Sequence, residues 1–514
     1  MALRPKKRKQ PPHLPECIPC VSNTFQYLTD MGSFLHRISG IVGFTLVRKQ
    51  VYMVAGARYT QNLLGPPHIM DPNMFHTLLM DKHWNMSKNE IKLFENDTSG
   101  RRKTPTLGME HIPTERRHWY NHHLLYAEFL SSAKYTQCLA DTFLRLFSER
   151  LRAESSHLWT TVSLHEFMKL NMTEAAIKSM FGSKILELNP DLIRTYWEFD
   201  EVAGILVWGL PRFLSPHPYA IRDRLHSMTS QMTDYAWQNF DWNGPDVSAD
   251  WDPYFGSRFS REVARWFRNA GFSDRTASGH TMATLFGLNG NTIPIATWML
   301  MEIIQDPQLS SKVRSEVDQA FVIDETGQRQ VDIKQLFGLP LIQSIYIEVL
   351  RMHISFNVTR EVKKDIFIDG YRIKKGSILQ CPSQIAHYDE AAWGHEGHPA
   401  SAFWAQRHLA EEHVSVASDS KVGMITPNFS MTARPTSFFP FGFGYAMCPG
   451  RHFAKREIIM AVAMIIDRFD IEFVNWTHVD GSVSDRSAQN DMKYAGTAGM
   501  PPDRDMRIRW KRRW

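Results

Sequence analysis

Apolar residues recur at helical spacing along much of the chain. The pattern predicts helices over residues 124–153, 160–186, 191–209, 334–352 and 451–468. A further segment, from residue 276 to 305, is apolar on nearly all sides, as expected for a long helix buried within the protein. Asp306-Pro307 marks its end, because proline disfavours helical backbone in the residue before it.

The hydrophobic period changes after residue 352. Residues 366–373 read as a β-hairpin with a turn at Asp369-Gly370. A helix-rich chain with a small late strand region predicts a mainly α fold with minor β. Residues 1–20 are basic and then proline-rich, which indicates an extended leader or hinge before one large domain over residues 21–514.

The composition fits a globular protein and excludes several classes. Of 514 residues, 43% are hydrophobic and 22% charged, so the chain can bury a large core. A net charge of +5 is too small to indicate nucleic-acid binding, and the basic tails predict either a solvated end or contact with a membrane surface. No apolar run reaches the roughly 18 residues of a transmembrane helix. Five scattered cysteines do not predict a disulfide framework.

The strongest chemical signal is a glycine-rich segment around one cysteine, Phe441-Gly442-Phe443-Gly444-Tyr445-Ala446-Met447-Cys448-Pro449-Gly450-Arg451. Glycines allow turn conformations and a close approach of the backbone to a flat ligand. Because proline often opens a helix, Cys448 should stand just before a helix N-terminus, where N–H groups and the helix dipole favour a thiolate. A thiolate is a strong axial donor to haem iron.

A buried structural cysteine beside a glycine turn is the alternative, and it would be preferred for a lone cysteine. Six positions of the segment match a specified pattern, however, and chance gives such a match with odds of roughly one in 10⁵. The segment resembles the haem-ligand signature of the cytochrome P450 family, Phe-x-x-Gly-x-x-x-Cys-x-Gly. The resemblance implies a haem ligated by Cys448 and contacted by Phe441, Gly442 and Gly450. It also implies a long central helix over the haem and the cysteine loop beneath it.

Other landmarks of that family occur in the expected order. Glu348 and Arg351 match its Glu-x-x-Arg pair, and Arg407 matches the arginine that completes a buried network, so the resemblance makes these three residues supports of the haem-side core. Surface charges with weak salt bridges are the alternative. Arg360 matches the position that contacts a haem propionate, which suits the forked guanidinium donors. Ala446 departs from the family, since many members carry Arg or His there.

The long buried helix contains two glycines, Asn291, Thr292 and Pro294. Pro294 cannot donate to the carbonyl of Gly290, so the helix should kink or open there; a simple packing kink is the alternative. By the resemblance, Asn291 and Thr292 stand where the family usually has an acid followed by Thr and handles dioxygen. Asn291 cannot ionise, so proton delivery is expected to fall to Thr292 and ordered water.

The resemblance implies a haem-thiolate monooxygenase that oxidises a hydrophobic small molecule such as a sterol, terpenoid, polyketide or alkaloid. Electrons would come through NADPH–cytochrome P450 reductase, and dioxygen is the co-substrate. The run from Cys448 is similar to fungal members, which suggests secondary metabolism, and the Asn-Thr-x-Pro pattern is similar to the clan of sterol 7α-hydroxylases and prostacyclin synthase. Two alternatives remain: a haem-thiolate isomerase or dehydratase that needs no reductase, and a non-catalytic haem protein.

Two further segments carry expectations about partners and location. Arg451, Lys455 and Arg456 lie near one helix face and form either a docking patch for an acidic reductase or an ordinary solvated face. His118 and His122 have metal-ligand spacing, although a surface or propionate-side role is expected. Family members in eukaryotes sit at the cytosolic face of the endoplasmic reticulum, and the same location, by peripheral attachment, is expected here.

Overall fold

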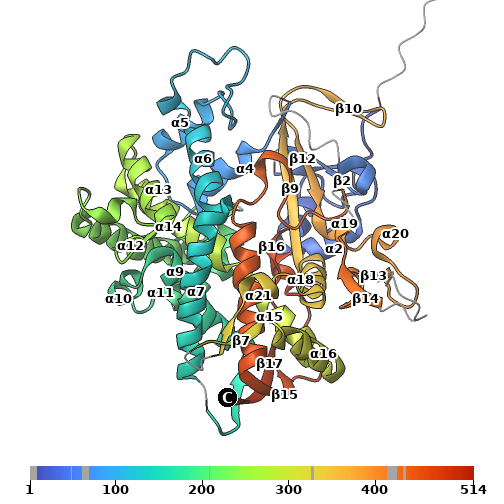
Figure 1. Ribbon diagram of the computed structural model, residues 1–514. Coiled ribbons are helices and arrows are strands. Elements are labelled where there is room, and N and C mark those ends of the chain that lie inside the picture. The colour runs from blue at the N-terminus through green and yellow to red at the C-terminus, as the bar shows by residue number, and fades with distance from the viewer. Residues whose placement is uncertain are drawn as a thin grey trace, which may run out of the picture.

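Helices dominate the fold, and the main sheet lies at the right of Figure 1. The computed structural model describes residues 9–514 except 48, 61–68, 155, 208, 326–328, 414–424 and 432–435. The predominance of helices confirms the prediction of a mainly α fold with minor β. The predicted leader lies partly outside the described residues, at positions 1–8. Its later part adds to the sheet edge, because the backbone of residues 12–14 bonds to Gly43.

The core centres on α21 (Arg451–Arg468), which has the predicted bounds. Its residues from Glu457 to Arg468 are all buried, because it packs against α7 (Ala133–Ala153) on one side and α15 (Thr292–Ile304) on another. Figure 1 shows α7 and α21 running side by side through the middle of the molecule.

A group of helices lies beside this core, at the left of Figure 1. It comprises α9 (Thr173–Phe181), α11 (Leu192–Val207), α12 (Pro216–Asn239), α13 (Arg258–Asn269) and α14 (Asp274–Asn289). The mutual packing of α11, α12 and α14 carries α11 to the place where α14 ends. The prediction of a helix over 191–209 is confirmed by α11.

Among the described residues, the main sheet has six strands. Its path runs through β1 (Ile41–Leu46), β2 (Lys49–Val54), β12 (Ile378–Pro382), β9 (Ile354–Val362) and β16 (Thr497–Gly499), and β3 (Met70–Asp71) also pairs with β9. The predicted hairpin forms from β10 (Ile366–Ile368) and β11 (Tyr371–Ile373). Asp369 and Gly370 have φ of 49° and 78°, so the turn uses the left-handed backbone that such short hairpins require.

Several predicted boundaries are wrong. The helix expected over 160–186 begins as a strand, β4 (Thr160–Ser163), and continues as α8 (Leu164–Phe167), a π-helical turn at Met168–Met172, α9 and α10 (Lys184–Leu188). The helix expected over 124–153 is two helices, α6 (His118–Ser131) and α7. The helix expected from residue 334 is α18 (Pro340–His353), preceded by the short α17 (Ile333–Leu336).

The long helix expected over 276–305 is interrupted. α14 ends at Asn289 and α15 begins at Thr292, so Gly290 and Asn291 form a break between them. Pro294 has no N–H to donate to Gly290, and the helical bonds resume only where the Ile295 N–H donates to the Asn291 carbonyl at 3.2 Å. The predicted opening of this helix is confirmed. Within the part of the chain that the structure describes, no helix has the length and apolar character to cross a bilayer.

Candidate active site

A cavity of about 320 Å³ lies between the α14–α15 break and the loop before α21. Asn291 and Thr292 line it from the break, and Cys448 lines it from the loop. Much of the remaining wall is apolar and comes from Leu130, Leu288, Ile295, Leu350, Phe441 and Phe453, among others. Two segments that lie some 150 residues apart in the sequence, each with a predicted site residue, therefore face one space.

The loop before α21 is held by its own backbone. The N–H of Cys448 donates to the Phe441 carbonyl at 2.9 Å, which closes the loop into a turn. Gly442 and Gly444 have φ of 69° and 66°, a conformation that residues with a Cβ rarely adopt. The glycines thus give the turn that places the cysteine side chain at the cavity.

The Cys448 side chain is exposed where it lines the cavity, and protein surrounds it on its other sides. Burial raises the pKa of its thiol, and the N–H groups of Gly450 and Arg451, with the Arg451 charge, lower it only in part. The helix N-terminus therefore offsets only part of the effect of burial on the pKa of this thiol. A metal ion bound to the sulfur would reverse this balance, since a coordinating thiol loses its proton.

The break in the long helix is fixed by the C-terminal part of the chain. The Gly499 N–H in β16 donates to Asn291 Oδ1 at 2.7 Å, and the Trp298 indole N–H donates to the Met500 carbonyl at 2.9 Å. Asn291 therefore uses its carbonyl oxygen to hold β16 while its side chain still lines the cavity. Thr292 is buried, at the first position of α15, and also faces the cavity.

Two cations gather beside the cysteine loop. Arg360, in β9, is buried and donates to the Phe443 carbonyl at 3.1 Å. Arg101 donates to Asn73 Oδ1 at 2.7 Å. The pKa of each guanidinium is lowered to about 10. Burial is the largest cause for both, the Asp71 carboxylate raises both, and the Arg360 charge lowers that of Arg101. Two guanidiniums near one carboxylate, Arg360 buried and Arg101 partly buried, fit a ligand that brings further carboxylates, as haem does.

Arg101 was not predicted from the sequence. It lies in a polar stretch of the sequence, and no local pattern distinguishes it from its neighbours Arg102 and Lys103. Glu457 was also missed. It lines the cavity from α21, both of its oxygens are buried without partners among the described residues, and burial raises its pKa well above the ordinary value.

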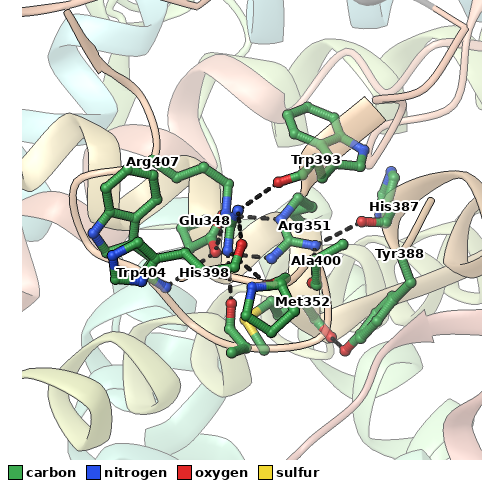
Figure 2. Close-up of polar contacts among 12 residues, drawn as sticks. Glu348, Arg351, Met352, His387, Tyr388, Trp393, His398, Ala400, Trp404 and Arg407 are labelled. Carbon is green, nitrogen blue, oxygen red and sulfur yellow. Dashed lines mark hydrogen bonds and ion pairs between the residues drawn. The ribbon is translucent and has the colours of Figure 1, made fainter. Parts of the chain in front are cut away.

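Glu348, Arg351 and Arg407 form one buried ion network (Figure 2). Arg351 donates to both oxygens of Glu348, at 2.8 and 2.9 Å, and Arg407 Nε donates to Glu348 Oε1 at 2.8 Å. The remaining donors of Arg351 reach the carbonyls of His387 and Ala400, both at 2.7 Å. Burial alone would raise the pKa of Glu348, but these hydrogen bonds and charges hold it at about 2.

The network ties α18 to the segment of residues 387–407, which leads toward the cysteine loop. Its three members do not belong to the cavity lining found in the described part of the chain. Glu348 and Arg351 are completely buried, so the alternative of surface charges is wrong. The geometry of the network is that of a structural support.

The remaining predicted residues lie in other surroundings. His118 and His122 pack into an aromatic cluster with Phe94 and His280 rather than on the surface, and among the described residues no group of side chains has a metal-binding arrangement. The basic face of α21 is only half-exposed. Arg451 donates to the Cys448 carbonyl, and Arg456 bonds to Gln137.

We expect Arg360→Ala and Arg101→Ala each to weaken haem retention by about 10- to 100-fold, the effect of losing a hydrogen bond to a charged group. The measurement is the rate at which the purified holoprotein releases haem to a scavenger protein. Arg58→Ala is the control, because Arg58 pairs with Asp369 on the exposed surface. Haem release as slow in both site variants as in the control would show that the two arginines do not hold the cofactor.

Comparisons with known proteins agree with this site. The family model for cytochrome P450 matches residues 12–484. The chain is 44% identical to cytochrome P450 monooxygenase calL of Penicillium decumbens, over 98% of this chain and 93% of that protein. It is 25% identical to cytochrome P450 monooxygenase fsoE of Humicola fuscoatra over 99% and 89%. It is 26% identical to cholesterol 7-alpha-monooxygenase of Cricetulus griseus over 70% and 68%.

Proposed function

The chain belongs to the cytochrome P450 family of haem-thiolate monooxygenases, and we propose that it oxidises a hydrophobic small molecule at a haem ligated by Cys448. The observation that carries this proposal is the single cavity lined by both Cys448 and Thr292. Cys448 would hold the iron, with Phe441, Gly442 and Gly450 around the sulfur. Arg360 and Arg101 would bind the propionates, while Glu348, Arg351 and Arg407 stabilise the surrounding core.

When bound, haem activates dioxygen, and its thiolate donor favours cleavage of the O–O bond. The chain itself supplies the surroundings of that reaction. The apolar walls favour an apolar substrate and exclude water. The Thr292 hydroxyl can both accept and donate a hydrogen bond, so it can pass a proton into the cavity. Asn291 holds the break open through its bond to Gly499.

The overall reaction consumes one dioxygen, one NADPH and one proton, because the hydride of NADPH brings two electrons and the second proton. It places one oxygen atom in the substrate and releases the other as water. The two electrons would come from NADPH–cytochrome P450 reductase, a separate flavoprotein. The relatives in Penicillium and Humicola support a fungal oxidation in secondary metabolism, and a sterol, terpenoid, polyketide or alkaloid would fit the apolar walls.

The test is turnover with a panel of such compounds in labelled dioxygen, with a fungal reductase and NADPH. We expect one labelled oxygen atom per product and no product without NADPH. Thr292→Ala is expected to lower product formed per NADPH by about tenfold or more, the size of effect usual for a lost proton donor. Thr297→Ala is the control, since Thr297 bonds to the Ile293 carbonyl one turn further along α15.

Two outcomes would contradict the proposal. Conversion of a hydroperoxide without NADPH would favour the haem-thiolate isomerase. This alternative arises because Asn291 stands where the family usually has an acid. Binding of haem with no turnover of any compound, in the parent and Thr292→Ala alike, would favour a non-catalytic haem protein.

We also propose peripheral contact with the cytosolic face of the endoplasmic reticulum membrane. Two groups of exposed apolar side chains support it, Ile18, Val21 and Phe25 near the N-terminus and Phe213 and Leu214 before α12. Apolar residues at such density on a surface are typical of membrane or protein contacts. Co-sedimentation of the full chain with phospholipid vesicles tests the contact.

A further inference from the structure

A buried carboxylic acid stands directly behind the break in the long helix. Asp200, on α11, is only 6% exposed. A Cβ added to Gly290 would lie 3.0 Å from Asp200 Oδ1 and 3.3 Å from the Tyr196 hydroxyl oxygen. Because Gly290 has no side chain, these two polar groups reach the backbone of the break. Tyr196 is fully buried, and its hydroxyl has no partner among the described residues.

We propose that Asp200 supplies protons to the break at Gly290-Asn291, where Asn291 itself has no acid to offer. This inference rests on the proposed function, because each monooxygenation needs two electrons and two protons at the site. Asp200 would give the proton on its carboxyl oxygen to the Tyr196 hydroxyl or a water at the break. Thr292 would receive it on the cavity side, and Asp200 would regain a proton from solvent. Asp200 does not line the cavity, so it is a positioning residue. The proton that it supplies reaches the cavity through Thr292.

The surroundings of Asp200 raise its pKa to about 7, so both protonation states are present near neutral pH. Burial is the largest cause, and the hydrogen bond from Tyr494 and the charge of Lys169 lower the pKa only in part. Glu201, the next residue of α11, raises it slightly. A group with this pKa both holds and releases a proton at physiological pH, as a proton donor must.

Arg224 of α12 and His83 after α4, two titratable groups on elements packed against α11, are paired or neutral. Arg224 of α12 pairs with Glu198. His83, at the end of α4 (Asn73–Lys82), lies 2.8 Å from the Ala203 carbonyl, and burial lowers its pKa to about 4. His83 is therefore neutral over the range in which Asp200 titrates.

Tyr494 connects this acid to the cavity wall and toward solvent. It is half-buried and lies three residues before Thr497, which lines the cavity together with Ala498 of β16. β16 in turn bonds to Asn291 through Gly499. Asp200 is thus joined to the break by its hydrogen bond from Tyr494, by the chain from residue 494 to 499, and by the bond from Gly499 to Asn291.

The first test is the infrared spectrum of the full-length holoprotein between about pH 5 and pH 9. We expect a protonated carboxyl band that disappears with a midpoint near pH 7, because Asp200 carries its proton below its pKa and loses it above. Burial also raises the pKa of Glu302 and Glu457, so the Asp200 component is identified in the difference between the parent and Asp200→Asn spectra. This component should be kept in the control, Glu201→Gln, which removes an exposed acid from the same helix. In the parent, the hydrogen bond from Tyr494 lowers the pKa of Asp200. Tyr494→Phe removes this bond and should therefore move the midpoint to higher pH.

The second test is NADPH consumption with a fungal reductase and dioxygen over the same pH range. The parent and Glu201→Gln should slow as the pH rises through about 7, and Asp200→Asn should be about tenfold slower below this pH and show no such decline. Gly290→Ala, which places a methyl group against the acid, should slow turnover similarly.

The reduced carbon monoxide difference spectrum separates the possible failures. If Asp200→Asn has the parent's spectrum, band and pH profile, the proton role is wrong and the proposed function stands. If the parent itself lacks the thiolate spectrum, both proposals are wrong.

Discussion

Replacing Cys448 by Ala is expected to remove the haem-thiolate spectrum and to lower haem affinity by more than about 100-fold. Loss of an outer-shell partner of a metal ligand already costs 10- to 100-fold, and this change removes the ligand itself. Cys448 is the cysteine that lines the cavity, and its sulfur faces the space shared with Thr292. The measurement is the haem-to-protein ratio together with the reduced carbon monoxide difference spectrum.

Cys381→Ser is the matched control. Cys381 lies in β12, where its sulfur is buried 3.4 Å from the Thr60 hydroxyl, and burial raises the pKa of its thiol to about 12. Such a thiol gives no thiolate for iron. We expect Cys381→Ser to keep the parent's spectrum. Full haem content with an unchanged spectrum in Cys448→Ala, or loss of both in Cys381→Ser, would remove the basis of the assignment.

Replacing Glu348 by Gln is expected to destabilise the protein by about 3–5 kcal/mol, because two buried arginines then lose their carboxylate. Arg351 and Arg407 have less than 5% of their side chains exposed, so water does not replace the lost charge. The free energy of unfolding in urea measures the effect. Glu472→Gln is the control: its partner Arg509 is half-exposed, and such surface pairs contribute about 0–1 kcal/mol.

The contribution of Glu348 should also depend on pH. Its folded-state pKa, about 2, lies below the ordinary value, so the folded protein prefers the charged form. The contribution is then fully present above about pH 4.5 and is lost as the pH falls through 4.5 toward 2. A difference between parent and Glu348→Gln of under 1 kcal/mol at neutral pH would contradict the structural role.

Features that depend on local sequence were predictable. The turn around Cys448 follows from glycines at positive φ, and α21 follows from its periodic apolar residues. The break at Gly290-Asn291 follows from the missing N–H of Pro294. In each case the cause and the effect lie within a few residues of one another.

Features that depend on distant pairing were not predictable from the sequence. Thr160–Ser163 begin the segment predicted as a helix over 160–186, yet they pair with β17 (Asp505–Arg512), where Ser163 stands opposite Arg507 of that strand. Arg101 and Asp200 have no local signal either. Each gains its significance from a residue far away in the chain, Arg360 for one and Gly290 for the other.

The two bonds that fasten residues 499 and 500 to the helix around Asn291 and Trp298 have a consequence for substrate selection. Ala498 forms part of the cavity wall just before these anchors. A substrate large enough to push this wall outward would also displace the residues that shape the break at Gly290-Asn291. Poorly fitting compounds should therefore waste reducing equivalents as hydrogen peroxide, so the enzyme would discriminate by coupling efficiency as well as by affinity.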